Sequence, residues 1–167
     1  MGWTFYNSSG EAMIIDGGGV AQFVSTLTGA AATGTTTISL DDSIPQIGEG
    51  DEYMTLAITP NNTNNKLVIQ VTWVGSTSVA GTMAVALFQD STSNALACAA
   101  DVGDGGTIAM RVITFTHIMD AGTTSSTTFR VRAGQDNSNT TSFNGRSGSR
   151  IYGGVCASSI KIWEFIT

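Results

Sequence analysis

From Ala21 to the end of the chain, short runs of alternating apolar and polar residues are separated by clusters of Gly, Ser, Asn and Asp. Alternation over four to eight residues is typical of a strand with one buried face, and it is clearest in residues 66–73 and 129–133. No capped helical stripe of ten residues or more interrupts this pattern. Strands are predicted at residues 22–28, 35–40, 53–59, 66–74, 82–89, 95–100, 107–119, 126–133 and 157–166. Eight or nine strands in a chain of 167 residues predict an all-β sandwich or jelly roll.

The first 24 residues form a unit of their own. An aromatic run at 3–6, a turn signal and a short apolar run at 12–15 predict a hairpin, which a glycine-rich link joins to the rest. A two-stranded hairpin is too small to be stable alone. We therefore expect it to pack on the main domain, on a sister chain or on another protein. The predicted organisation is an N-terminal arm, 1–24, followed by one jelly-roll domain, 25–167.

Two predicted strands carry apolar residues on both faces. In 107–119, one face carries Met110, Val112 and Ile118, and the other face carries Ile113, Phe115 and Met119. In 157–166, three isoleucines share the strand with two aromatic residues: Ile160, Ile162, Ile166, Trp163 and Phe165. A sandwich strand normally exposes one face to water, so a second surface must cover these. The arm or a symmetry-related subunit would supply it, and we expect an oligomer. The alternative is a central strand beneath long loops.

The composition predicts a neutral surface and excludes several partners. Only 12% of residues are charged, whereas Thr, Ser, Gly and Asn fill 70 of the 167 positions. The net charge of −6 opposes binding to the phosphate backbone of nucleic acids. No apolar run is long enough for a membrane-spanning helix, and the first residues do not resemble a signal peptide. We therefore expect neither a nucleic-acid nor a membrane partner.

No catalytic or metal-binding constellation stands out. His117, the one histidine, lies mid-strand and is interpreted as a packed or interface residue, which would sense pH if stacked around a symmetry axis. The acids at 41–42 and 49–52 lie in turn-like sequence, and are interpreted as a solvated loop without calcium-loop spacing. Residues 101–106 read as a hairpin turn. The chain is therefore expected to be no enzyme and to need no cofactor or metal.

Cys98 and Cys156 are the only cysteines, and each lies in an apolar, alanine-rich setting. Free cysteine behaves as a small hydrophobic residue that is usually buried. We interpret both as buried free thiols. A disulfide between them, which would suit an extracellular protein, is the alternative.

Several segments resemble a recurrent bacteriophage virion module: residues 28–36, 41–46, 50–54, 58–60, 86–90 and 152–162. This module resembles domains on phage tail fibres and small phage surface proteins. Its strand pattern is similar to the trimeric jelly rolls of the tumour-necrosis-factor and complement globular-head type. The likeness spans residues 25–167, and it implies a homotrimer on the virion that binds and does not catalyse.

The resemblance also implies roles for particular residues. It places the last strand near a three-fold axis, with a trimer interface made by Ile162, Trp163 and Phe165 and with Phe115 as a neighbour. It places the loop 137–152 at an exposed rim or tip, where the binding residues would be Asn137, Asn139, Phe143, Arg146 and Tyr152. No catalytic residue is carried over.

Two functions follow from this resemblance. In the first, the chain is a capsid decoration or head-fibre protein that binds the major capsid protein through its arm, with apolar anchors at Trp3, Phe5, Tyr6, Met13 and Ile14. In the second, it is a tail-fibre tip whose loops bind a host surface glycan or receptor. The short segment before the domain favours decoration, because a fibre subunit usually carries a long shaft. Both place the protein in the virion, assembled in the host cytoplasm. The hairpin covering its own sandwich is the alternative role for the arm.

Overall fold

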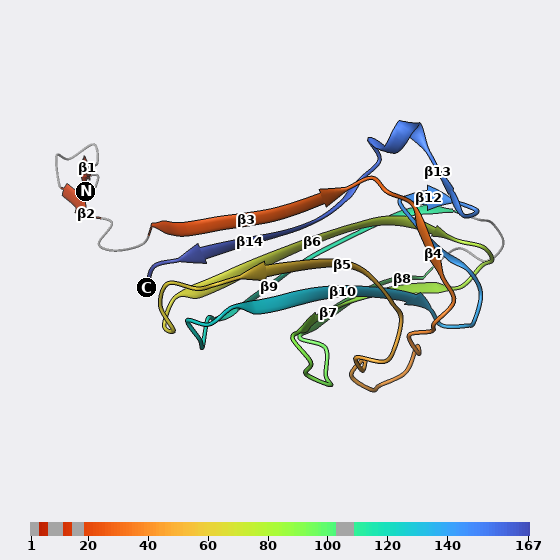
Figure 1. Cartoon of the computed structure of the whole chain (residues 1–167), viewed down its shortest axis with the longest axis horizontal. Coiled ribbons are helices and arrows are strands. Elements are labelled where there is room, and N and C mark those ends of the chain that lie inside the picture. Colours follow the sequence, from red (N-terminus) through yellow and green to blue (C-terminus); the bar gives the residue numbers. More distant parts are fainter. Residues whose placement is uncertain (1–3, 7–11, 15–18, 103–108) are drawn as a thin grey trace.

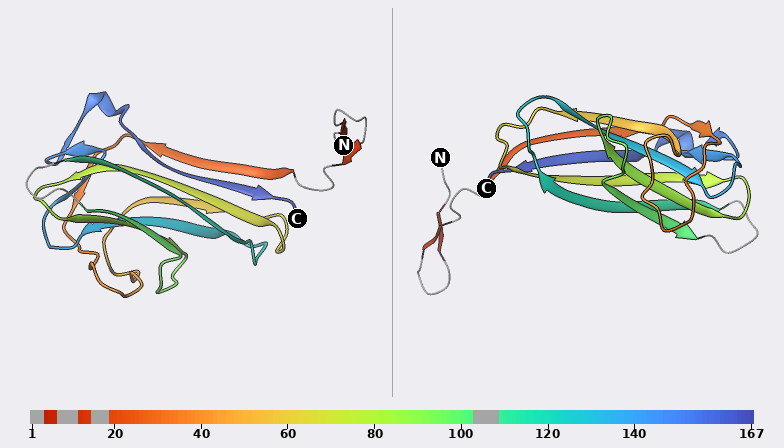
Figure 2. Two further views of the ribbon diagram at one scale, coloured as in Figure 1. Left: turned by 180° about the vertical axis from the view of Figure 1, so that it is seen from behind. Right: turned by 90° about the horizontal axis from the view of Figure 1, so that it is seen from below.

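A computed structural model describes residues 4–6, 12–14, 19–102 and 109–167 of the chain, and it is built almost entirely of strands (Figure 1). Two antiparallel sheets pack face to face, as the views in Figure 2 show. The first contains β3 (Val20–Thr28), β14 (Ser158–Phe165), β6 (Lys66–Thr77) and β9 (Met110–Asp120), in that order. At its far end β6 also pairs with β11 (Thr141–Phe143), which pairs with β4 (Ala32–Gly34).

The second sheet has the order β5 (Asp51–Ile58), β10 (Thr127–Gln135), β7 (Thr82–Gln89) and β8 (Ala97–Val102). Strands that are distant in sequence lie side by side in both sheets, which is the strand order of a jelly roll. The predicted all-β jelly roll is therefore confirmed. Among the described residues the one helical element is the 3₁₀ turn η1 (Tyr152–Gly154), and no helix there has the length and apolarity to cross a membrane.

Eight of the nine predicted strands are present within a few residues of their expected bounds, as far as the structure describes them. The predicted strand at 35–40 is wrong, because residues 35–50 form a loop that crosses the outer face of β7 and β10. Ile38 is buried under this loop and its backbone N–H donates to the Gln135 carbonyl. A Cβ on Gly134 would lie 2.5 Å from the Thr36 carbonyl oxygen, so glycine is what permits this close approach.

The main core lies between the two sheets. Alternate residues of β6 are completely buried there: Leu67, Ile69, Val71 and Trp73. They pack against the inward residues of the other sheet: Met83, Val85, Leu87, Phe129, Val131 and Ala133. A smaller cluster on the outer face of that sheet joins Ile38 to Ala84, Ala86 and Phe88. The chain itself thus covers the outer face of the second sheet over β7.

The N-terminal hairpin is present as predicted. Strand β1 (Thr4–Tyr6) pairs antiparallel with β2 (Ala12–Ile14), and Phe5 lies opposite Met13 in the register. Trp3, one of the five predicted anchors, lies outside the described residues. The anchoring role of the arm stays a prediction.

Glu164 in β14 is completely buried, although it is an acid. Its carboxylate accepts hydrogen bonds from Gln22 Nε2 at 2.6 Å, Asn65 Nδ2 at 2.6 Å and the Asn61 backbone N–H at 2.8 Å. The Asn61 side chain and the Asn62 N–H also donate to it. Burial alone would raise the pKa of Glu164, but these hydrogen bonds outweigh it and lower the pKa below the ordinary value. The carboxylate thereby ties β3, β14 and the loop 59–65 together.

Candidate interaction surfaces

The outer face of the β3–β14–β6–β9 sheet, here called the open face, carries an apolar row that lies beside rows of mostly polar residues. One row of paired residues crosses all four strands: Phe23, Trp163, Val68 and Ile118. The Phe23 and Trp163 rings lie 5.1 Å apart between centroids. Leu27, Val112 and Ile118 on this face are 72%, 66% and 63% exposed. Contiguous apolar patches of this kind mark interaction sites, because water solvates them poorly.

The two faces of β9 separate as their alternation predicted. Val112 and Ile118 lie on the open face, whereas Ile113, Phe115 and Met119 pack on the core. The sequence predicted that a second surface covers the outer faces of β9 and β14. The loop 35–50 is not that surface, because it covers the other sheet. The open face is therefore available to a partner.

The predicted trimer-interface residues divide between the two sides of the sheet. Trp163 and Phe165 lie on the open face, as an interface role requires. Ile162 is completely buried in the core beside Ile69, and Phe115 packs on the same core. Their side chains therefore do not reach the open face, and we correct the prediction by removing both. Phe23 and Val68 were missed, because only the strand register aligns them with Trp163. Ile118 was expected to need a covering surface, but its place in the same row also comes from the register.

His117 is half-buried on the inner side of β9, opposite Ile69 in the register. Burial lowers the pKa of its imidazole. The interpretation as a packed histidine agrees with this position, and its inward side keeps it off the open face.

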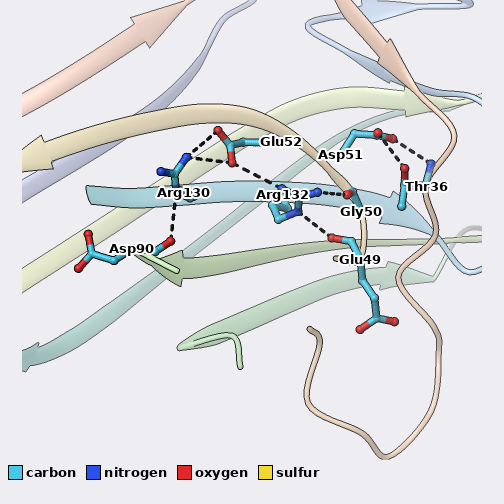
Figure 3. A network of polar contacts seen from close by, with 8 residues as sticks. All are labelled: Thr36, Glu49, Gly50, Asp51, Glu52, Asp90, Arg130 and Arg132. Atoms are coloured by element: carbon cyan, nitrogen blue, oxygen red, sulfur yellow. Dashed lines mark hydrogen bonds and ion pairs between the residues drawn. The ribbon is translucent and has the colours of Figure 1, made fainter. Parts of the chain in front are cut away.

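The acidic residues at 49–52 hold the covering loop in place and do not converge on a cleft (Figure 3). Glu52 accepts from Arg130 at 3.1 Å and lies 3.5 Å from Arg132. Arg132 also donates to the carbonyl oxygens of Glu49 and Gly50 at 2.9 and 2.8 Å. Asp51 accepts from the N–H and hydroxyl of Thr36. The solvated-loop interpretation is thus corrected for residues 49–52. Two backbone carbonyls fasten the loop to β10 through Arg132, and Asp51 fastens it to β5 through Thr36. Glu52 belongs to β5 and pairs with arginines of the neighbouring strand.

Replacing Glu52 with Gln is expected to lower the free energy of unfolding by less than about 1 kcal/mol, because partly exposed ion pairs contribute little. Both ion pairs of Glu52 involve side chains that are up to about one-third exposed. Urea unfolding followed by tryptophan fluorescence measures the change, and 1 M salt should shrink it further. A loss above 2 kcal/mol would contradict this weak role for the pair.

Of the five predicted loop residues, two are fully available to a partner. Arg146, in the short hairpin β12 (Gly145–Arg146) and β13 (Ser149–Arg150), is exposed, and Tyr152 in η1 is 78% exposed. Asn137 and Asn139 are half-buried and hydrogen-bonded to each other. The prediction that Phe143 is an exposed contact is wrong, because its side chain is buried and stacks on Tyr53 with ring centroids 4.9 Å apart.

Both cysteines are free thiols, as expected. The expected burial is wrong: Cys98 is exposed and Cys156 is half-buried. Within the described part of the chain, no group of three or more His, Cys, Asp or Glu side chains is placed to hold a metal ion.

No protein-family model and no curated protein matches the chain. Eiger TNF from S. frugiperda is 12% identical over 85% of this chain and 92% of that chain, with a TM-score of 0.43. The C-terminal domain of EclA, a sugar-binding protein, is 12% identical over 86% and 87%, with a TM-score of 0.40. The infectious bursal disease virus Gt strain structure is 14% identical over 98% of this chain and 42% of that chain, with a TM-score of 0.41. At these identities and TM-scores the similarities assign neither a family nor a function to this chain.

Proposed function

We propose that this chain is a non-enzymatic bacteriophage virion protein, a homotrimeric capsid decoration protein bound to the shell through its N-terminal arm. Its partners are two further copies of itself and the major capsid protein or another virion protein. Its place is the capsid surface. The jelly roll supplies a rigid outer domain and the arm supplies the attachment.

The observation that supports this proposal most is the asymmetry between the two sheets. The chain covers the outer face of β7 with its own loop, through Ile38, but leaves Phe23, Trp163 and Ile118 on the open face. A second copy is the occupant that fits, because the row is apolar and a closed ring of copies buries the same face in each. Three copies joined in this way present three arms, which raises avidity for a repeating shell without tighter single contacts.

The test is the copy number of this protein relative to the major capsid protein in purified particles, measured by quantitative mass spectrometry. A ratio of the same order as the shell protein is expected for a decoration protein. A few copies per particle would overturn decoration and place the protein in the tail or at one vertex.

Deleting residues 1–16 is expected to abolish binding to capsids while the domain stays folded and oligomeric. The domain is expected to keep its core, because the buried hydrophobic residues whose burial the structure describes lie between Ile38 and Ile162. Binding is measured by co-sedimentation of the purified protein with capsids that lack it, and the full chain is the control. Unchanged co-sedimentation of the deletion variant would remove the arm as the anchor.

A second candidate function, recognition of a host-cell surface by a tail-fibre tip, is favoured by the exposure of Tyr152 in η1. Exposed loop residues on a rigid scaffold are a common place for binding. Adsorption of fluorescently labelled protein to host cells tests it, and the absence of adsorption would exclude it.

A further inference from the structure

The most exposed apolar residues in the described chain lie together at one end of the sandwich. Tyr152 is 78% exposed and Val155 is 86% exposed, on and just after η1. Figure 1 shows η1 projecting beyond the sheets beside the β12–β13 hairpin. We call residues 145–155 the tip.

Tyr152 has an unfavourable backbone conformation for its residue type. Its φ is 45°, in the left-handed region, and Gly153 and Gly154 follow with φ of 65° and 90°. A side chain in this region costs roughly 1–2 kcal/mol compared with glycine. Exposure leaves the Tyr152 ring with little packing to offset this cost. Strain of this kind is concentrated at binding sites, where a ligand makes the contacts that the fold lacks.

The tip is fixed in place. A Cβ on Gly29 would lie 1.8 Å from the Gly154 carbonyl oxygen, so the turn presses directly on the β3–β4 connection. Asn144, completely buried at the base of the tip, donates to the carbonyl oxygens of Thr28 and Ala30. Its side-chain oxygen accepts from Ser158 at 2.7 Å. A ligand that binds here meets an aromatic side chain on a rigid support, which reduces the entropy lost on binding.

The tip is also a local concentration of positive charge. Lys66, Arg111, Arg130 and Arg132 each pair with a carboxylate. Arg146 and Arg150 form no ion pair with any described residue, and no acidic residue occurs between positions 137 and 163. The Arg150 guanidinium lies along the turn, with Nη1 3.3 Å from the position that a Gly154 Cβ would occupy. The chain as a whole carries −6, whereas residues 145–155 carry two arginines and no acid, which favours an anion there.

We propose that the tip binds an acidic carbohydrate, with Tyr152 as the stacking platform and Arg150 as the donor to its carboxylate or sulfate. A guanidinium fork matches such groups with two parallel hydrogen bonds. The hydroxyls of Ser147 and Ser149 are available to neutral sugar hydroxyls. The tip comprises 11 residues, fewer than the roughly 20–30 residues that each partner contributes to a standard protein–protein interface, which favours a small ligand. The inference rests on the second candidate function.

The test compares binding of the full chain to a glycan array that pairs each sialylated, uronic-acid or sulfated glycan with its neutral counterpart. Acidic members should bind at least tenfold more strongly. Tyr152→Gly and Arg150→Gln should each reduce that binding at least tenfold. Neither substitution should lower the midpoint of unfolding, in the case of Tyr152→Gly because glycine accepts the left-handed conformation. Arg130→Gln, which removes the same guanidinium charge from the other sheet, where Arg130 pairs with Glu52, is the matched control and should bind normally.

Equal binding to acidic and neutral glycans, or full binding by Tyr152→Gly, would overturn the inference. Adsorption to host cells separates this failure from that of the function. Suppose that Tyr152→Gly does not adsorb, and that adsorption of the wild-type chain is abolished when the cells are treated with protease but not when their glycans are removed. The partner is then a protein, which overturns the carbohydrate assignment while host-cell recognition stands. No adsorption of the wild-type chain overturns both.

Discussion

Replacing Glu164 with Gln is expected to lower the free energy of unfolding by about 3 kcal/mol, because a hydrogen bond to a buried charge contributes roughly 1.5–3 kcal/mol and unmatched donors add a penalty. The glutamine amide would place its own N–H groups against donors that now point at the carboxylate, Gln22 Nε2 and Asn65 Nδ2 among them. At 2–4 °C per kcal/mol for a domain of this size, the midpoint of thermal unfolding should fall by roughly 10 °C. Urea unfolding and a thermal scan measure the two quantities.

Asp42→Asn is the matched control for this substitution. Asp42 is exposed on the loop 35–50, and the same acid-to-amide change there should alter stability by less than about 0.5 kcal/mol. If Glu164→Gln were as mild as Asp42→Asn, the carboxylate would not be what ties β3, β14 and the loop 59–65 together.

The same carboxylate makes a prediction about pH. The pKa of Glu164 is lowered in the folded chain, so the unfolded chain takes up the proton first as the pH falls. Its stabilisation is therefore complete above the ordinary glutamate pKa of about 4.3 and is lost as the pH drops through the lower folded value. Urea unfolding between pH 7 and pH 3 should show the wild type losing stability toward the Glu164→Gln value. Parallel curves would contradict this linkage.

Alternation in the sequence was enough to predict an all-β sandwich or jelly roll and to separate the two faces of β9. Val112 and Ile118 fall on one side and Ile113 on the other because the side-chain period of a strand is fixed at two. The same rule places Glu164 on the buried side with Ile160 and Ile162. An acid at an inward position was therefore a signal in the sequence. What the sequence did not reveal is the set of donors, which comes from residues about 100 positions away.

The errors have a common physical origin. The segment 35–40 alternates like a strand, but its hydrogen bonds go to Gln135 and Asp51 and its one buried residue, Ile38, serves as a lid. Phe143 sits in a polar loop-like sequence but pairs with Gly75, whose lack of a side chain leaves room for aromatic packing. In both, long-range contacts overrode the local pattern. The open face could be predicted only in part for the same reason. Trp163 could be assigned to it from the sequence, but Phe23 could not, because only the pairing of β3 with β14 brings the two residues together.

Replacing Ile118 with Glu is expected to weaken self-association at least 100-fold, because it places a charge in the apolar row that forms the proposed contact. A penalty of about 3 kcal/mol, typical for an uncompensated buried charge at an interface, corresponds to this change in dissociation constant. The wild-type chain should elute with three times the 17.3 kDa chain mass in size-exclusion chromatography with light scattering. The variant should elute as a monomer with unchanged circular dichroism, because Ile118 is already exposed in the single chain.

Leu40→Glu is the control that isolates the open face. Leu40 and Ile118 are both 63% exposed, but Leu40 lies in the loop 35–50 over the other sheet. The same charge is thus added to an equally exposed aliphatic residue on the opposite side of the sandwich. Trimer mass for Leu40→Glu and monomer mass for Ile118→Glu would locate the contact on the open face. A wild-type monomer at 100 µM (about the upper range of such measurements) would contradict self-association, because micromolar affinity needs only about 8 kcal/mol. A mass of two chains would keep the face as the contact and overturn the trimer.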